Sequence, residues 1–212
     1  MRLLLGTRNR GKIAEIVRIL SDVPRLELYT SEDVPFADVA ETGSTFVENA
    51  HLKARQISSE TGYPVLAEDS GLEVDALDGA PGIHTARFAG VTATIEANIA
   101  KLLTALDGVE DRSARFVCVA VLHRSDRDEI VTEGELRGRI ARDAKGDGGF
   151  GYDPVFIPDG YGQTLAELGD EIKREISHRR RALDGIRDEL LRTLASTSTP
   201  RAEDDQSPSS SS

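Results

Sequence analysis

Two long strand-like segments separated by a polar turn constrain the fold of this chain most strongly. They are "ARFVCVAVLHR" at residues 114–124 and "EIVTEGELRGRI" at 129–140, and "SDRD" lies between them. Runs rich in Val, Ile, Thr and Phe that are joined by a short polar turn are typical of paired strands. The sequence therefore predicts a long hairpin in the middle of the chain.

Helical patterns surround this hairpin. After the strand-like "RLLLG" and the polar turn "TRNRGK", apolar residues recur at helical spacing from Ile13 to Leu20. Further helices are predicted over 45–57, where Thr45 and Glu48 are spaced as a capping box, over 94–106 and over 178–194. Short extended segments are predicted at 64–67, 72–77 and 151–158. Strands and helices that alternate in this way favour an α/β protein with a mixed sheet.

Length and composition limit the class of protein. The chain has 212 residues, of which 39% are hydrophobic, so it can bury a sizeable core as one domain. Its one cysteine, Cys118, excludes an internal disulfide and favours a reducing cytoplasm. We expect no signal peptide and no membrane span. The Ser-rich segment 196–212 has almost nothing to bury, and we expect it to be disordered.

The net charge bears on the partners of the protein. A formal charge of −11 argues against a nucleic-acid binder, because such a surface needs basic residues to neutralise phosphates. A small ligand, or one that brings its own cation, is the expected partner.

Polar residues at the first turn and after segment 64–67 favour a phosphate ligand. The turn "TRNRGK" precedes a helix, whose unpaired N–H groups attract anions, and its side chains add further donors. Glu68 and Asp69 are expected at the C-terminal end of a short strand, where open α/β sheets bind ligands. Oxygen ligands without a cysteine or histidine cluster favour Mg²⁺ over zinc.

Each of these features also has an ordinary structural interpretation. The turn could be exposed, the acids (Glu41, Glu48, Glu68, Asp69, Glu73 and Asp75) could be solvated, and Ser177 could simply cap the last helix. The stretch "GDGGFG" at 146–151 matches a dinucleotide-binding pattern, but Asp-Pro follows where a helix should begin. Phe150 and Tyr152 in this stretch could stack on a base or pack in the core. The combination of clusters favours a ligand site.

Five segments resemble a known family. They are "TRNRGKIAEI", "ETGSTFVENAHLKA", "AEDSGLEVDALDGAPGIHTARFAG", "GDGGFGYDPVF" and "IKREISHRRRAL". In this order they resemble the inosine triphosphate pyrophosphatase family, which hydrolyses ITP, dITP and XTP to the monophosphate and pyrophosphate and so removes them from the nucleotide pool. The resemblance covers residues 2 to about 194. It implies an elongated central mixed sheet flanked by helices, a single domain over 1–195 with two lobes and a substrate cleft between them, Mg²⁺ dependence and a homodimer.

The resemblance also implies roles for individual residues. The triphosphate cradle corresponds to Thr7, Arg8, Asn9, Arg10, Gly11 and Lys12, with Lys53 as a helper. Glu41 and Asp69 correspond to the metal-binding pair, Asp69 also to the proton acceptor, and Ser70 to a substrate contact. The wall that contacts the base and sugar corresponds to Phe150, Gly151, Tyr152 and Asp153. The residues that close over the purine and its phosphates correspond to Lys173, His178 and Arg179.

Several alternatives stay open at the level of the sequence. A carboxylate that ligates Mg²⁺ is a poor base, so Asp69 could orient water instead, and Glu68 could share that role. The departures from the family pattern, Arg8, Tyr152 and Arg174, concern fine specificity. Two other functions compete with this one. The protein could be a sensor that binds nucleotide without turnover, or a pyrophosphatase for modified pyrimidine or methylated nucleotides. "SHRR" and "FGYDP" favour the purine nucleotides.

Overall fold

A six-stranded mixed sheet forms the centre of the protein, in the computed structural model that describes residues 1–125 and 127–196. The strands are β1 (Arg2–Leu5), β2 (Glu27–Tyr29), β3 (Val65–Val74), β4 (Ser113–His123), β5 (Ile130–Ile140) and β6 (Phe156–Pro158). The helices are α1 (Arg10–Leu20), α2 (Phe46–Thr61), α3 (Ile95–Ala105), α4 (Leu165–Ile176) and α5 (His178–Ser196). The spatial order is β2-β1-β3-β4-β5-β6, with β1 parallel to β2 and β3 and the other pairs antiparallel. The predicted mixed α/β fold is confirmed.

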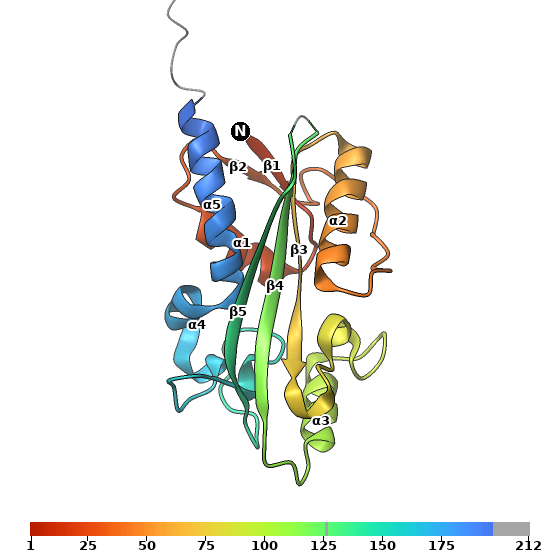
Figure 1. The fold of residues 1–212 in the computed structure, drawn as a ribbon, viewed down its shortest axis with the longest axis vertical. Coiled ribbons are helices and arrows are strands. Elements are labelled where there is room, and N and C mark those ends of the chain that lie inside the picture. Colours follow the sequence, from red (N-terminus) through yellow and green to blue (C-terminus); the bar gives the residue numbers. More distant parts are fainter. Residues whose placement is uncertain (126, 197–212) are drawn as a thin grey trace, which may run out of the picture.

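The predicted hairpin is the longest part of the sheet. β4 and β5 pair antiparallel from Ser113 with Arg139 to Leu122 with Ile130, and β3 pairs with the other edge of β4 over ten residues. These three strands run most of the length of the molecule (Figure 1). The helices α1, α2 and α5 lie along one end of them, and α3 and α4 lie toward the other.

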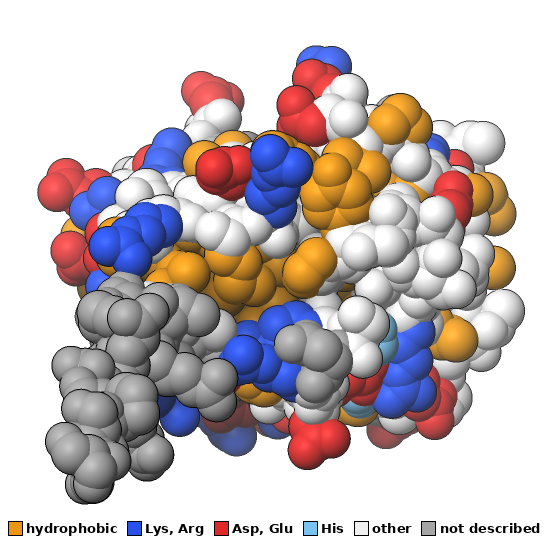
Figure 2. Space-filling model, turned by 90° about the horizontal axis from the view of Figure 1, so that it is seen from above, with side chains coloured by type: hydrophobic (Ala, Val, Ile, Leu, Met, Phe, Trp, Pro, Cys, Tyr) orange, Lys and Arg blue, Asp and Glu red, His pale blue; other side chains and the backbone are white. Residues whose placement is uncertain are grey.

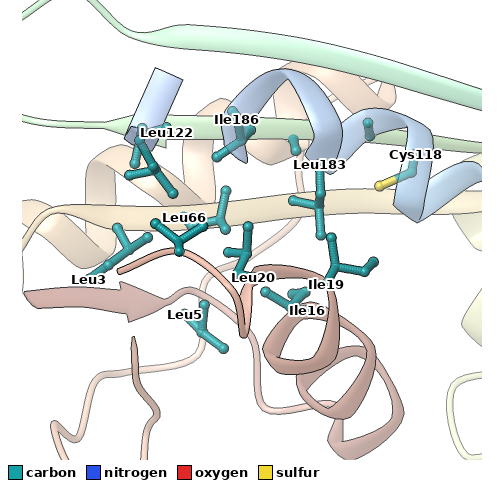
Figure 3. Close-up of a cluster of buried hydrophobic side chains, with 14 residues drawn as sticks. Leu3, Leu5, Ile16, Ile19, Leu20, Leu66, Cys118, Leu122, Leu183 and Ile186 are labelled. Carbon is teal, nitrogen blue, oxygen red and sulfur yellow. The ribbon is translucent and has the colours of Figure 1, made fainter. Parts of the chain in front are cut away.

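Two apolar clusters cover the two faces of the sheet at the α1, α2 and α5 end. On one face, Leu3, Leu66 and Cys118 pack with residues of α1 and α5, and Figure 3 shows these side chains interleaved. On the other face, the alternate residues Leu4 and Ala67 pack against α2. Successive strand residues point to opposite faces, so β1 and β3, which are buried on both faces, contribute to both clusters. A third cluster, around Leu72, Phe116 and α3, fills the far end of the sheet.

The helix ends follow the local sequence. The side chain of Thr45 caps α2 by accepting from Glu48 N at 3.2 Å, as its spacing predicts. The Glu48 carboxylate accepts from Ser44 N instead of completing the capping box. At the other end, Gly62 adopts the left-handed conformation that terminates α2 at φ 72°.

Four elements differ from the sequence-based expectation. Of the segment predicted to be extended at 151–158, Asp153–Val155 form a 3₁₀ turn and only Phe156–Pro158 form a strand. The segments predicted at 64–67 and 72–77 form one strand, β3, and residues 75–77 form a 3₁₀ turn. The short strand β2 and the helix α4 were not predicted. Gly169 inside α4 has a φ of 81°, and this kink divides the helical pattern into two pieces that are too short to recognise. Of the segment predicted to be disordered, residues 197–212 lie outside the described residues.

The surface carries charges of both signs. Seen from above, Lys and Arg side chains alternate with Asp and Glu around a central area of hydrophobic side chains (Figure 2). Within the described residues, no helix combines the length and the apolar character that crossing a membrane requires.

Gly134 of β5 allows α5 to begin directly against the sheet. A Cβ atom at this position would lie 2.2 Å from the carbonyl oxygen of His178 and 2.4 Å from the amide nitrogen of Ala182. Backbone atoms cannot yield as a flexible side chain can, so only glycine permits this approach. The contact fixes the first turn of α5, which contains His178 and Arg179.

We expect Gly134→Ala to destabilise the protein by about 1 to 3 kcal/mol, because the new methyl group must push the first turn of α5 away from β5. Urea denaturation measures the change. Gly162→Ala is the matched control, since a Cβ there meets no atom within 4 Å, and it should stay within about 0.5 kcal/mol of the parent protein. Equal stability of both variants would show that α5 is not held by this contact.

Candidate active site

A cleft opens where β1 ends and β3 continues. The last bond between them joins Gly6 N to Leu66 O, and beyond it β3 faces the 3₁₀ segment Gly82–Arg87. The cleft encloses about 280 Å³ and is lined by residues of α1, β3, β4, α3, α4, the start of α5 and the loops between them. Ligands of open α/β sheets bind at such a crevice, outside the carboxyl end of a parallel strand.

Glu68 and Asp69 do not lie at the end of a strand, and that part of the prediction is wrong. They lie in the middle of β3, and the strand that ends beside them is β1. Because adjacent strand residues point to opposite faces, Glu68 faces α1 and α5 whereas Asp69 faces α2. The two acids therefore have different partners.

Asp69 shares the ammonium group of Lys53 with Glu41. The Nζ atom of Lys53 lies 2.8 Å from Oδ1 of Asp69 and 3.0 Å from Oε1 of Glu41. Asn49, one turn before Lys53 on α2, donates to Oδ2 of Asp69 at 3.3 Å, and Arg87 reaches Oε2 of Glu41 at the same distance. Side chains from a loop, α2, β3 and the 82–87 segment meet here.

Burial and charge act in opposite directions on this group. Burial raises the pKa of Asp69 above its usual value, although Lys53 lowers it. Burial also opposes ionisation of Glu41, but Lys53 and Arg87 outweigh it, and the pKa of Glu41 is lowered. The pKa of Lys53 is raised because the two carboxylates overcome the effect of its burial. Lys53 is therefore a cation at neutral pH.

Glu68 binds two cations on the other face. Its carboxylate lies 3.2 Å from Nε of Arg179 and 3.0 Å from Nζ of Lys12, and the thiol of Cys118 donates to it at 2.9 Å. Burial opposes its ionisation, but Arg179 and Lys12 prevail and hold the pKa of Glu68 well below its usual range. This carboxylate is a fixed anion and a weak base.

Further ion pairs extend from Arg179 to the loop of Phe150. Glu15 accepts from Arg179 and lies 2.7 Å from Nζ of Lys173, which in turn lies 2.6 Å from Oδ2 of Asp153. Asp153 also accepts from Phe150 N at 2.7 Å. The ammonium of Lys173 lies 4.3 Å from the centre of the Phe150 ring, a cation–π distance.

His178 lies beside these charges and is neutral. Burial, reinforced by the charge of Arg179, holds the pKa of His178 well below its usual value. Its ring stacks on Phe116 at 4.8 Å with an interplanar angle of 13°. Its buried Nδ1 atom has no hydrogen-bond partner among the described residues. Buried polar atoms normally have a hydrogen-bond partner, so a ligand or a water molecule is expected to bind at this atom.

The residues of the predicted phosphate cradle differ in their position. Asn9 caps α1 by accepting from Lys12 N at 3.1 Å, and both residues line the cleft. Gly11 packs under the Phe150 ring, where an added Cβ would lie 2.9 Å from the nearest ring atom. Arg8 turns toward Asp38 at 2.6 Å and stacks near Phe36. Thr7 and Arg10 are not among the residues that line the cleft.

The other predicted residues gather around the cleft. Its lining includes Glu41, Asp69, Ser70, Phe150, Gly151, Tyr152, Asp153, Lys173, His178 and Arg179. The hydroxyl of Tyr152 donates to the carbonyl oxygen of Thr85 at 3.0 Å, and the ring packs with the third apolar cluster. Tyr152 therefore serves the core as well as the cleft wall.

Sequence reasoning missed Glu15, Asn49 and Phe116. Glu15 lies three residues after Lys12, a spacing that places both on one face of α1, and this spacing was the available signal. Asn49 lies four residues before Lys53, which also places the two on one face of α2. Nothing local marks Phe116, because its contact with His178 joins distant parts of the chain.

The acid pair has the chemistry of a magnesium site. Glu41 and Asp69 bring one hard oxygen each to a single cation, and Asp69 is buried whereas Glu41 stays partly open to water. Among the described residues, no group of three or more Asp, Glu, His or Cys side chains could hold a metal. Mg²⁺ commonly takes one or two carboxylates and completes its shell with phosphate and water oxygens, so the pair fits this ion.

Comparison with known proteins identifies the family of this chain. The model of the Ham1 family matches residues 3–189. The chain belongs to the Ham1 family. It is 46% identical to a dITP/XTP pyrophosphatase of Vibrio parahaemolyticus, over 87% of this chain and 94% of that one, and 48% identical to one of Geobacter sulfurreducens, over 89% and 96%.

Solved structures of Ham1 proteins have the same fold. The Ham1 protein of Staphylococcus aureus superposes with a TM-score of 0.81 at 42% identity, covering 90% of this chain and 98% of that one. A protein of Mycobacterium abscessus described as a nucleoside-triphosphatase / dITP/XTP pyrophosphatase gives 0.72 at 44% identity, covering 88% and 97%. The expected family and fold class are thus confirmed.

We expect Glu68→Gln to cost about 3 kcal/mol or more of folding stability, because Arg179 and Lys12 would lose their shared buried anion. Urea denaturation at neutral pH measures this. Glu73→Gln on the same strand is the control, since Glu73 is partly exposed and pairs with Arg115 at 2.7 Å. It should cost at most about 1 kcal/mol. Similar losses in both variants would contradict a special role of Glu68.

Proposed function

We propose that this protein is a nucleoside triphosphate pyrophosphatase that converts dITP, XTP and ITP to the monophosphate and pyrophosphate with Mg²⁺. The observation that carries the proposal is the meeting, in one cleft, of the carboxylates of Glu41 and Asp69 with cations and with His178, whose buried Nδ1 atom has no hydrogen-bond partner among the described residues. The names of the relatives support the same substrates. Removal of these nucleotides before incorporation into DNA or RNA is the role that follows.

The side chains of the cleft suit both parts of a nucleotide. Lys53, beside Asp69, and the cleft residues Lys12 and Asn9 offer donors to the triphosphate. Phe150 and His178, which line the same cleft, offer an aromatic face and a ring nitrogen to the base. In this orientation the α-phosphate lies near Asp69.

The reaction breaks the bond between the α-phosphorus and the bridging oxygen of pyrophosphate. A water molecule attacks the α-phosphorus, pyrophosphate leaves, and no covalent enzyme intermediate is required. Asp69 accepts or orients the proton of that water, because Glu68 is already paired with Lys12 and Arg179. Bound Mg²⁺, held by Glu41 and Asp69, would neutralise charge on the phosphate oxygens.

Selection of the base rests on the hydrogen-bond donors and acceptors that the base and the protein present to each other. Hypoxanthine and xanthine present an acceptor at position 6, where adenine presents a donor. Neutral His178 can donate from one ring nitrogen, whereas Arg179 is already bound to Glu15, Glu68 and Ser70. Arg179 thus holds the site in place, and His178 is the stronger candidate for contact with the base.

The homodimer and the cytoplasmic location also belong to this proposal. They rest on the family resemblance and on the single buried thiol of Cys118, which needs no oxidising compartment. Sedimentation equilibrium of the full chain measures the assembly state directly.

We expect Asp69→Asn to lower the rate of pyrophosphate release from ITP at least about a hundredfold, because both the base and half of the carboxylate pair are lost. Pyrophosphate is measured in a coupled assay with Mg²⁺. Asp75→Asn, on the 3₁₀ turn that follows β3, should retain the parent rate. Full turnover by Asp69→Asn would refute the assignment.

A panel of nucleotides tests the substrate class. We expect kcat/KM for ITP, dITP and XTP to exceed that for ATP by more than tenfold, since an unpaired buried donor costs about 1 to 3 kcal/mol. We expect the same preference over GTP, which shares the 6-oxo acceptor and differs from ITP by its 2-amino group. The assay scores pyrophosphate against orthophosphate for each nucleotide. Comparable pyrophosphate release from ATP would refute the preference, and binding without release would favour a nucleotide sensor.

A further inference from the structure

Every oxygen of the Glu41 and Asp69 carboxylates already has a donor. Lys53 bridges one oxygen of each, Asn49 donates to the second oxygen of Asp69, and Arg87 donates to the second oxygen of Glu41. The distances run from 2.8 to 3.3 Å. A carboxylate pair in this state is satisfied without a metal.

The charges of this group are also balanced. Two carboxylates face two cations, Lys53 and Arg87, and Lys53 is almost wholly buried. A dication that joined the four side chains would add two positive charges within a few ångströms of the buried ammonium. Like charges repel strongly where water is excluded. This repulsion from Lys53 opposes the binding of a metal ion in the absence of nucleotide.

A nucleoside triphosphate changes this balance. Its phosphate oxygens bring several negative charges into the same cleft, which Arg87 lines and Lys53 adjoins. The two cations can then move from the carboxylates to phosphate oxygens, and the carboxylate oxygens become available. Metal binding at the carboxylates is therefore favourable only when the metal and the triphosphate enter the cleft together.

We infer that Lys53, assisted by Arg87, occupies the place of the metal in the nucleotide-free protein, so that Mg²⁺ enters the site with the nucleotide. This inference rests on the proposed function. It makes Lys53 a positioning residue with two states, bound to the acid pair before the substrate arrives and bound to phosphate afterwards. Free metal then binds weakly at this site.

The test measures metal binding without nucleotide. Mn²⁺, which also prefers oxygen ligands, is titrated into the full chain and the free ion is followed by electron paramagnetic resonance. We expect weak binding by the parent protein and at least about tenfold tighter binding by Lys53→Met, since one buried charge no longer opposes the ion. Arg87→Met should give a smaller gain, because Arg87 is a third exposed and more screened.

Two controls separate this effect from a general change in charge. Lys101→Met removes one positive charge elsewhere, where the ammonium lies 2.5 Å from the carbonyl oxygen of Phe88 and 4.4 Å from its ring centre. It should bind Mn²⁺ as the parent protein does, and so should Lys53→Arg, which keeps the charge. Circular dichroism shows whether each variant is folded.

The Mn²⁺ affinities of these variants either support or overturn the inference. Tighter binding by Lys53→Met and Arg87→Met, but not by the two controls, supports it. Unchanged binding by a folded Lys53→Met, or an equal gain in Lys101→Met, overturns it. If Lys53→Met does not fold, the result for Arg87→Met decides. Because no turnover is involved, a lack of pyrophosphate release from ITP would count against the proposed function alone.

Discussion

The unequal length of β1 and β3 is the constraint on which the cleft depends. β1 has four residues and β3 has ten, so β3 continues beyond its parallel neighbour and is held from the other side by β4. The loop after β1 turns into α1 at this point, and Asn9 and Lys12 therefore lie beside the middle of β3. A longer β1 would cover the edge of β3 and leave no space for a ligand.

The pleat of β3 then divides the acidic residues between two sets of helices. Glu68 meets cations from α1 and α5, and Asp69 meets Lys53 from α2. The helices that cover the apolar parts of the two faces thus also neutralise the acids. Placing charges inside a sheet is costly, and this arrangement offsets the cost only while each partner remains in position. Gly134 matters for this reason, because it holds the first turn of α5 and with it Arg179.

The elements with clear periodicity could be predicted from the sequence, namely the hairpin, α1, α2, α3 and α5. The continuous strand β3 could not, since Glu68, Asp69, Ser70 and Gly71 have the composition of a turn. What keeps them extended is the pairing with β4 and the charge of Arg179, more than a hundred residues later. Motif resemblance found most of the residues around the cleft, but it could not show that Arg8 turns away toward Asp38 or that Glu15 joins Arg179 to Lys173.

Two adjacent carboxylic acids of one strand thus acquire opposite properties from their surroundings. Glu68 pairs with two cations and accepts from a thiol, and its pKa is lowered. Asp69 has to share its one cation with Glu41, and its pKa is raised. Surroundings that separate the pKa values of two acids in this way give the acids different chemical roles. The function that we propose uses this difference: Glu68 stays bound to Arg179 and Lys12, and Asp69 would be the acid that meets the water and the metal.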